Sequence, residues 1–171
     1  SADVEGNISF KVRGRVVERS IANRWTPVAG TSDASWSQDN EVVFDRLQSW
    51  RNPARGFLVT ANNRISDQGP YISLDFAGPS RHDRIVELLS ELFDATVDDM
   101  TKIHRDVKSL VAPTLIKIFV ENAGHCRHSL SSEAIALLSD WDCEVTESST
   151  AATIYNVVRR RWAETVGTHL G

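Results

Sequence analysis

The sequence has no excess of basic residues, no long hydrophobic run and no leader pattern at its start. Its formal net charge of −4 and its pI near 5.7 argue against a general nucleic-acid binder, which normally carries a basic surface. It contains no apolar run of about 18 residues, so no membrane-spanning helix is predicted. A basic stretch followed by an apolar one is also missing, so no secretory signal is predicted. We therefore expect no nucleic-acid partner and no membrane span.

Cysteine is scarce, which limits the cross-links and metal sites that the chain can form. The only cysteines are Cys126 and Cys143. Their spacing matches no metal-binding motif, and His125 and His128 beside Cys126 would leave a zinc ion without a fourth ligand. We favour two free, buried or half-buried thiols, while a disulfide between them depends on a geometry that the sequence does not give.

The hydrophobic residues that are present suffice for one substantial core. With 171 residues, of which 41% are hydrophobic, length alone suggests a single domain. The part over 1–80 is predicted to consist of strands and loops. Alternating apolar and polar residues over 8–12, a turn at Gly14 and a return over 16–19 predict a β-hairpin there.

The part over 81–171 is predicted to be helical. Apolar residues at three- and four-residue steps predict an amphipathic helix over 81–94. Thr96, with Asp99 three residues later, marks the start of a second helix whose apolar stripe continues to Val111. Pro113 is expected to kink or break that helix, because its ring clashes with the preceding turn. Helical segments are also predicted over 115–120, from Ser131 or Ser132 to Trp141, and over about 150–165.

The segment at 52–64 bears most directly on function. It reads Asn-Pro-Ala-Arg-Gly-Phe-Leu-Val-Thr-Ala-Asn-Asn-Arg. Pro53 and Gly56 predict a turn, and 57–60 predicts a short buried strand. Asn62 and Asn63 then stand at the strand end, a common place for a site on a rigid scaffold. A carboxamide N–H can stabilise an oxyanion without a titrating charge, although a plain Asn-Asn turn is the alternative interpretation.

Five segments, in order over nearly the whole chain, carry a family pattern. They are A-D-V-E-G-N-I-S-F at 2–10, P-V-A-G at 27–30 followed by Trp36, the segment at 52–64, R-H-D-R-I-V-E-L-L at 81–89, and L-S-D-W-D at 138–142. Together they resemble the penicillin amidase (penicillin acylase) family of N-terminal nucleophile hydrolases. Two departures are Val17, where the family's G-x-x-P-x-R turn has proline, and Ser37, where a glycine commonly follows the tryptophan.

The resemblance implies catalytic roles for Asn62 and Arg84. Asn62 aligns with the first of the family's two consecutive asparagines, which donates its side-chain amide to the oxygen of the tetrahedral intermediate. Arg84, 22 residues later as in the family, aligns with an arginine that helps to hold the asparagine and the nucleophile's free amine in place. A guanidinium suits that role because it is planar, permanently charged and rich in donors.

The resemblance also implies that the nucleophile lies outside these residues. Family members expose a Ser, Thr or Cys by self-cleavage, a long stretch of chain before the G-N-I segment, which here begins at Gly6. Ser1 carries both a hydroxyl and an amine, but its context and its short separation from Asn62 do not match. We interpret Ser1 as an artificial end or tag remnant. The chain is then a fragment of the large chain that we expect to be inactive alone.

The implied fold is α+β. Antiparallel strands of a four-layer αββα core are expected over 1–80, and a helical part is expected over 81–171. Together the two parts form one fragment of a larger chain. The expected partners are the remainder of the parent hydrolase, namely its small chain and the nucleophile-bearing part of its large chain, and a small-molecule amide substrate. Exposed strand edges are expected to pair with the absent chain or with a second copy, so a homo-oligomer is also open. The resemblance favours a periplasmic or secreted bacterial parent.

No cofactor is expected. Some family members bind calcium through an acidic residue shortly after the asparagine pair. Counting along this chain places Ser73 there, with Asp75 two residues on, which makes a calcium site doubtful.

Three hypotheses of function follow. The first is a part in the hydrolysis of N-acyl compounds such as β-lactams or N-acyl homoserine lactones. The second is a non-catalytic binding or scaffold module with a degenerate hydrolase fold, although a dead copy has no chemical reason to keep Asn62 and Arg84 at this spacing. The third is a self-sufficient hydrolase that uses Ser1. A Gly-Ser, Gly-Thr or Gly-Cys processing site far upstream in the reading frame would favour the first.

Overall fold

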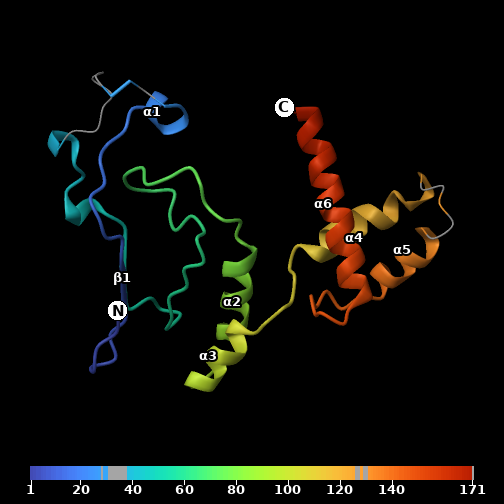
Figure 1. The fold of residues 1–171 in the computed structure, drawn as a ribbon. Helices are drawn as coiled ribbons and strands as arrows, with labels where there is room; N and C mark the ends of the chain where they lie inside the picture. Colours follow the sequence, from blue (N-terminus) through green and yellow to red (C-terminus); the bar gives the residue numbers. More distant parts are fainter. Residues whose placement is uncertain (28, 31–37, 126–127, 129–130, 171) are drawn as a thin grey trace. The chain divides into compact units, whose positions relative to one another are not determined.

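A computed structural model describes residues 1–27, 29–30, 38–125, 128 and 131–170. The backbone divides into two compact units, Ser1–Leu92 and Phe93–Gly171 (Figure 1). The described residues contain helices and one two-stranded antiparallel sheet, so the fold class is α+β. No helix among them is long and apolar enough to cross a membrane.

The sheet of the first unit joins distant parts of the chain. β1 (Ser9–Lys11) pairs antiparallel with β2 (Ser49–Arg51), and Phe10 lies opposite Trp50. The centroids of these two rings are 5.7 Å apart. Such a cross-strand aromatic pair contributes roughly 0.2–1 kcal/mol to the stability of a sheet.

The predicted hairpin between 8–12 and 16–19 is wrong, because each half pairs elsewhere. Val17 forms an isolated antiparallel bridge with Glu41. The first half pairs with β2, where Trp50 supplies an aromatic partner that 16–19 does not contain. Both halves of the predicted hairpin therefore pair with residues far along the chain.

Between and after the strands the first unit is mostly irregular, with short helical turns. These are α1 (Ala22–Trp25), η1 (Gln38–Asn40) and η2 (Phe44–Arg46), and the unit ends with α2 (Ser80–Ser90). The helix predicted over 81–94 is thus present but stops at Ser90. Val42, Leu47 and Ala61 are buried in this unit.

Of the two elements predicted before Asn62, the turn is present and the strand is not. The N–H of Gly56 donates to the carbonyl of Pro53 at 2.9 Å, which confirms the turn. Gly56 has φ of +76°, a value that favours glycine. The strand over 57–60 is wrong, because these residues are half-buried to exposed and belong to no sheet of the described chain. A strand needs a neighbour for its backbone groups, and no described strand lies alongside.

The second unit is built from helices. They are α3 (Val97–His104), α4 (Ala112–Glu121), the short η3 (Ala123–His125), α5 (Ser131–Ser139) and α6 (Thr150–Leu170). The predicted start of α3 is confirmed, because Thr96 and Asp99 form a reciprocal capping box. The Thr96 hydroxyl donates to the Asp99 carboxylate, and this bond lowers the pKa of Asp99 below its ordinary value.

The helix predicted to continue to Val111 instead ends at His104. The next residues form backbone hydrogen bonds with 143–145: Val145 N–H donates to the Val107 carbonyl at 3.0 Å, and Ser109 N–H donates to the Cys143 carbonyl at 2.9 Å. Pro113 lies in the first turn of α4, where a missing N–H costs no helical hydrogen bond. The proline therefore starts a helix rather than kinking one.

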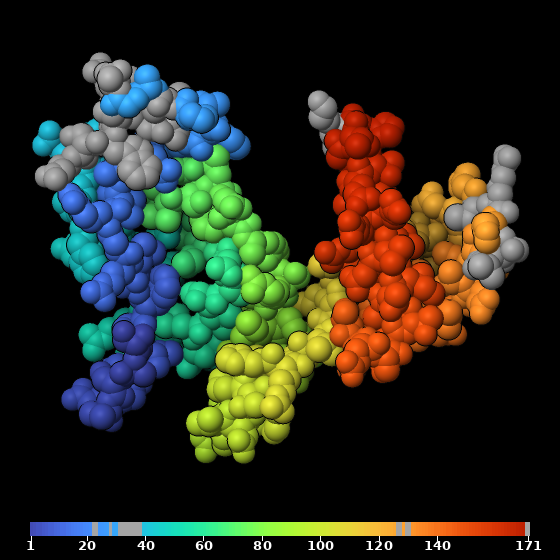
Figure 2. All heavy atoms as spheres, in the orientation of Figure 1, coloured from blue at the N-terminus to red at the C-terminus, as the bar shows by residue number. Residues whose placement is uncertain are grey.

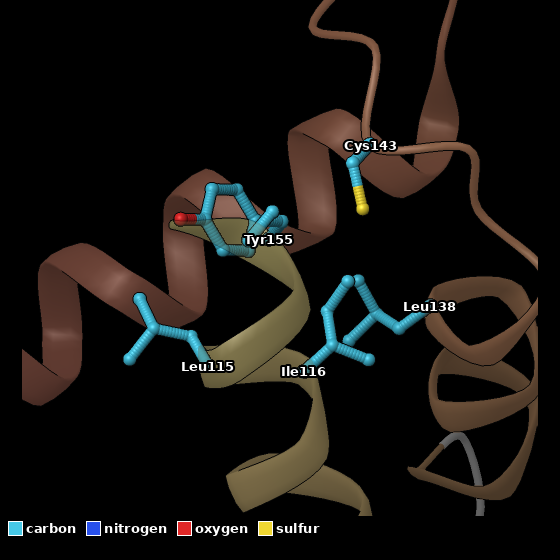
Figure 3. Packing of buried hydrophobic residues seen from close by; sticks show 6 residues of the cluster. Leu115, Ile116, Leu138, Cys143 and Tyr155 are labelled. Atoms are coloured by element: carbon cyan, nitrogen blue, oxygen red, sulfur yellow. The ribbon is translucent and has the colours of Figure 1, made fainter. Parts of the chain in front are cut away.

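Helices α4, α5 and α6 enclose the core of the second unit. Its buried residues are Ala112, Leu115, Ile116, Leu138, Cys143 and Tyr155 (Figure 3). Cys143 is a free thiol, as expected, and its burial raises its pKa. Cys126 lies outside the described residues. Beyond Arg159 the described residues of α6 are exposed, and Figure 2 shows this end of the helix standing clear of α4 and α5.

Tyr155 anchors this core, and its hydroxyl gives a test of the packing. The side chain is 1% exposed, its ring lies 5.2 Å from that of Trp141, and its hydroxyl has no hydrogen-bond partner among the described residues. Tyr155→Ala is expected to lower the free energy of unfolding by about 3–5 kcal/mol, as for other large aromatic deletions. Tyr155→Phe removes only an unpartnered polar group, so it should leave stability unchanged or slightly raised. Urea denaturation measures both, and a costly Tyr155→Phe would mean that the hydroxyl is hydrogen-bonded.

Candidate functional site

Asn62 occupies a constrained backbone position after the half-buried segment 57–59. Its φ is +61°, a left-handed conformation that asparagine tolerates better than most residues. Its carbonyl accepts a hydrogen bond from the N–H of Ala77 at 2.7 Å. The side chain of Asn63 accepts from the N–H of buried Ala61 at 3.0 Å. We call the resulting bend at 61–63 the asparagine turn, and it fixes where the Asn62 side chain begins.

The carboxamide of Asn62 is held by an arginine that sequence reasoning did not single out. Nη2 of Arg81 donates to Oδ1 of Asn62 at 2.9 Å and to the carbonyl of Ala61 at 2.9 Å. A guanidinium has donors only, so the carboxamide must present its oxygen to Arg81. Its NH₂ group is then turned away from Arg81.

Arg84 lies one helical turn after Arg81 on α2. Residues three apart in a helix share a face, so the two arginines follow each other along one side of α2. The side chain of Arg84 is 17% exposed, and its Nη1 forms an ion pair with Oε2 of Glu87 at 3.0 Å. Arg81 donates to the Asn62 side chain, and one contact of Arg84 is its ion pair with Glu87.

A hollow of about 400 Å³ lies beside the asparagine turn. Phe10 and Trp50 from the sheet line it together with Leu58, and His82 lines it from α2. Residues on both sides of Asn62 in the sequence also line it, among them Asn63. Apolar and aromatic walls with a few polar groups are typical of sites for small molecules.

Comparisons with known proteins show the family of this chain. The family model described as "Penicillin amidase" matches residues 1–171. The chain belongs to the penicillin amidase family. The similar proteins include the "Penicillin acylase 2 proenzyme" of Pseudomonas sp. (strain SE83), which is 34% identical over 167 residues. The match covers 94% of this chain and 21% of that protein, so the chain spans about a fifth of the relative's length.

Membership of the penicillin amidase family raises the question of calcium, and the residues here do not fit it. Ser73, at the position of the family's acidic residue, has a neutral hydroxyl that accepts from the N–H of Asp75 at 3.0 Å. Within the described part of the chain, no three His, Cys, Asp or Glu side chains are grouped to hold a metal ion. We assign no metal ligand.

Ser1, the candidate of the self-sufficient hypothesis, lies beside the first strand. Its α-ammonium donates to the carbonyl of Ser9 at 2.8 Å, and the N–H of Ser9 donates back to the carbonyl of Ser1 at 2.9 Å. The amine that would have to act as base is therefore engaged with the backbone next to β1.

Proposed function

We propose that this chain is part of an amide hydrolase in which Asn62 is an oxyanion donor and Arg84 organises the site. One observation carries the proposal. Arg81 binds the oxygen of the Asn62 carboxamide, which leaves the NH₂ group of Asn62 for another acceptor. Family membership supports the reaction class, and the similarity to a penicillin acylase supports an N-acyl β-lactam as the substrate class. An N-acyl homoserine lactone is the other substrate of this proposal.

The chemistry follows from the charge that develops during amide cleavage. When a nucleophile adds to the amide carbonyl, the carbonyl oxygen becomes an oxyanion. An N–H of Asn62 that donates to this oxygen stabilises it more than the neutral carbonyl of the substrate. Arg84 adds a permanent positive charge on the same face of α2 as Arg81. The hollow beside the asparagine turn is lined by Asn63 but not by Asn62 or Arg84, and in this proposal it holds a part of the substrate away from the reacting amide.

We also propose which other chains complete this hydrolase and to which core its sheet belongs. The small chain and the nucleophile-bearing part of the large chain would be the partners, in keeping with a relative that is a proenzyme of which this chain matches 21%. The two-stranded sheet would belong to the family's four-layer αββα core. The proposed mechanism uses no cofactor.

The parent protein tests the proposal directly. We expect the reading frame that contains this sequence to encode a Ser, Thr or Cys processing site far upstream. The purified product should hydrolyse a chromogenic acyl anilide, and N-terminal sequencing should find that residue first in its mature large chain. A reading frame without such a site, and a product that does not turn over a panel of acyl anilides, would favour a non-catalytic binding or scaffold module instead.

A further inference from the structure

Three hydrogen bonds tie the asparagine turn to the start of α2. The N–H of Ala77 donates to the backbone carbonyl of Asn62 at 2.7 Å, just before the helix begins. Arg81, in the first turn of the helix, donates to the neighbouring carbonyl of Ala61 and to the Asn62 side chain, each at 2.9 Å. The carboxamide of Asn62 is thus held by α2, and its backbone is held by the segment that leads into α2.

The bonds of Arg81 decide which end of the carboxamide is free. An amide that rotates by half a turn exchanges its oxygen and its NH₂ group, and only one orientation can donate to an oxyanion. Because a guanidinium cannot accept a hydrogen bond, Arg81 disfavours the orientation with the NH₂ group toward it. A charge-assisted bond to the oxygen also polarises the amide, which makes its N–H a stronger donor.

We propose that Arg81 is a positioning residue that sets the orientation of the Asn62 carboxamide for oxyanion binding. This inference rests on the proposed function of Asn62 and adds a residue to it. Arg81 acts through Asn62 and does not itself touch the reacting atoms. Its second bond, to Ala61, holds the guanidinium in place, so that the contact with Asn62 is preorganised.

Arg81→Ala in the complete processed hydrolase is expected to lower kcat roughly tenfold and to leave KM nearly unchanged, since a donor used in the transition state is then no longer oriented. Arg81→Lys should restore part of the loss, because an ammonium can donate to the oxygen but sits on a more flexible stem than the planar guanidinium, whose Nη2 donates to both Ala61 and Asn62. Millimolar methylguanidinium should raise the kcat of Arg81→Ala. The control is Arg15→Ala, which removes an exposed ion pair with Glu41 in the same unit and should keep wild-type kinetics.

A double-mutant cycle separates positioning through Asn62 from a general structural role. If Arg81 acts through Asn62, the double variant Asn62→Ala with Arg81→Ala will have the kcat of Asn62→Ala alone, and methylguanidinium will not raise it. A double variant roughly tenfold slower than Asn62→Ala would overturn the inference, as would a wild-type kcat for Arg81→Ala. If Asn62→Ala itself keeps a normal kcat, the proposed function of Asn62 fails first, and that single variant identifies the failure.

Discussion

Replacing Asn62 by alanine in the complete, processed hydrolase is expected to lower kcat by ~10²–10³, with a much smaller effect on KM. In the proposed role the carboxamide N–H stabilises charge that develops only as the nucleophile adds, so its loss should affect the chemical step more than substrate binding. Steady-state kinetics with a chromogenic acyl anilide measure both constants. The mature chains must first be confirmed, because the same asparagine can serve in self-cleavage.

Two further variants sharpen this prediction. Asn62→Asp should be no milder than Asn62→Ala, because at neutral pH a carboxylate has no donor and faces the developing negative charge. Asn122→Ala removes a carboxamide that only bonds a carbonyl within its own unit, that of Ile118, and should keep a normal kcat. Near-normal kcat in processed Asn62→Ala protein would show that the Asn62 carboxamide is structural, and family membership would then support the fold alone.

The sequence located Asn62 but not the residue that holds it. A carboxamide at this position is conspicuous because it belongs to a family pattern that extends over nearly the whole chain. Arg81 belongs to the same family pattern as the first residue of the segment at 81–89, but the pattern assigned it no role, and an arginine in the first turn of an amphipathic helix ordinarily only faces solvent. Its contact with Asn62 depends on the register of α2 against the asparagine turn, 19 residues earlier. The available signal was its place one turn before Arg84, on the same helix face.

The fold was predictable where local physics decides it. The start of α3 was found because Thr96 and Asp99 satisfy each other within one turn. The pairing of β1 with β2 could not be predicted, because Phe10 and Trp50 are far apart in the sequence. The alternation of apolar and polar residues predicts a strand but not which strand it pairs with. The end of α3 was missed for a similar reason. Its apolar stripe continues past His104, but the backbone carbonyl of Val107 accepts a hydrogen bond from the N–H of Val145 in a distant segment.

Two other hypotheses, a scaffold module and a self-sufficient hydrolase, compete with the proposal that the chain is part of a larger enzyme. They differ in what the 171 residues must do by themselves. A scaffold module requires only folding and binding. A self-sufficient hydrolase requires Ser1 to attack while its own amine accepts the proton. That amine donates to the Ser9 carbonyl at 2.8 Å, so it would have to leave this contact before it could serve as base.

We therefore expect the 171-residue chain by itself to hydrolyse no amide. Donors for an oxyanion do not by themselves attack an amide, and in the proposed function the nucleophile belongs to another part of the hydrolase. Incubation with phenylacetyl and other acyl anilides, with the complete processed hydrolase as the positive control, measures this. Turnover by the chain alone that disappears in Ser1→Ala would contradict the fragment interpretation and establish Ser1 as the nucleophile. Turnover that survives Ser1→Ala would point to a contaminating amidase, which a second purification would remove.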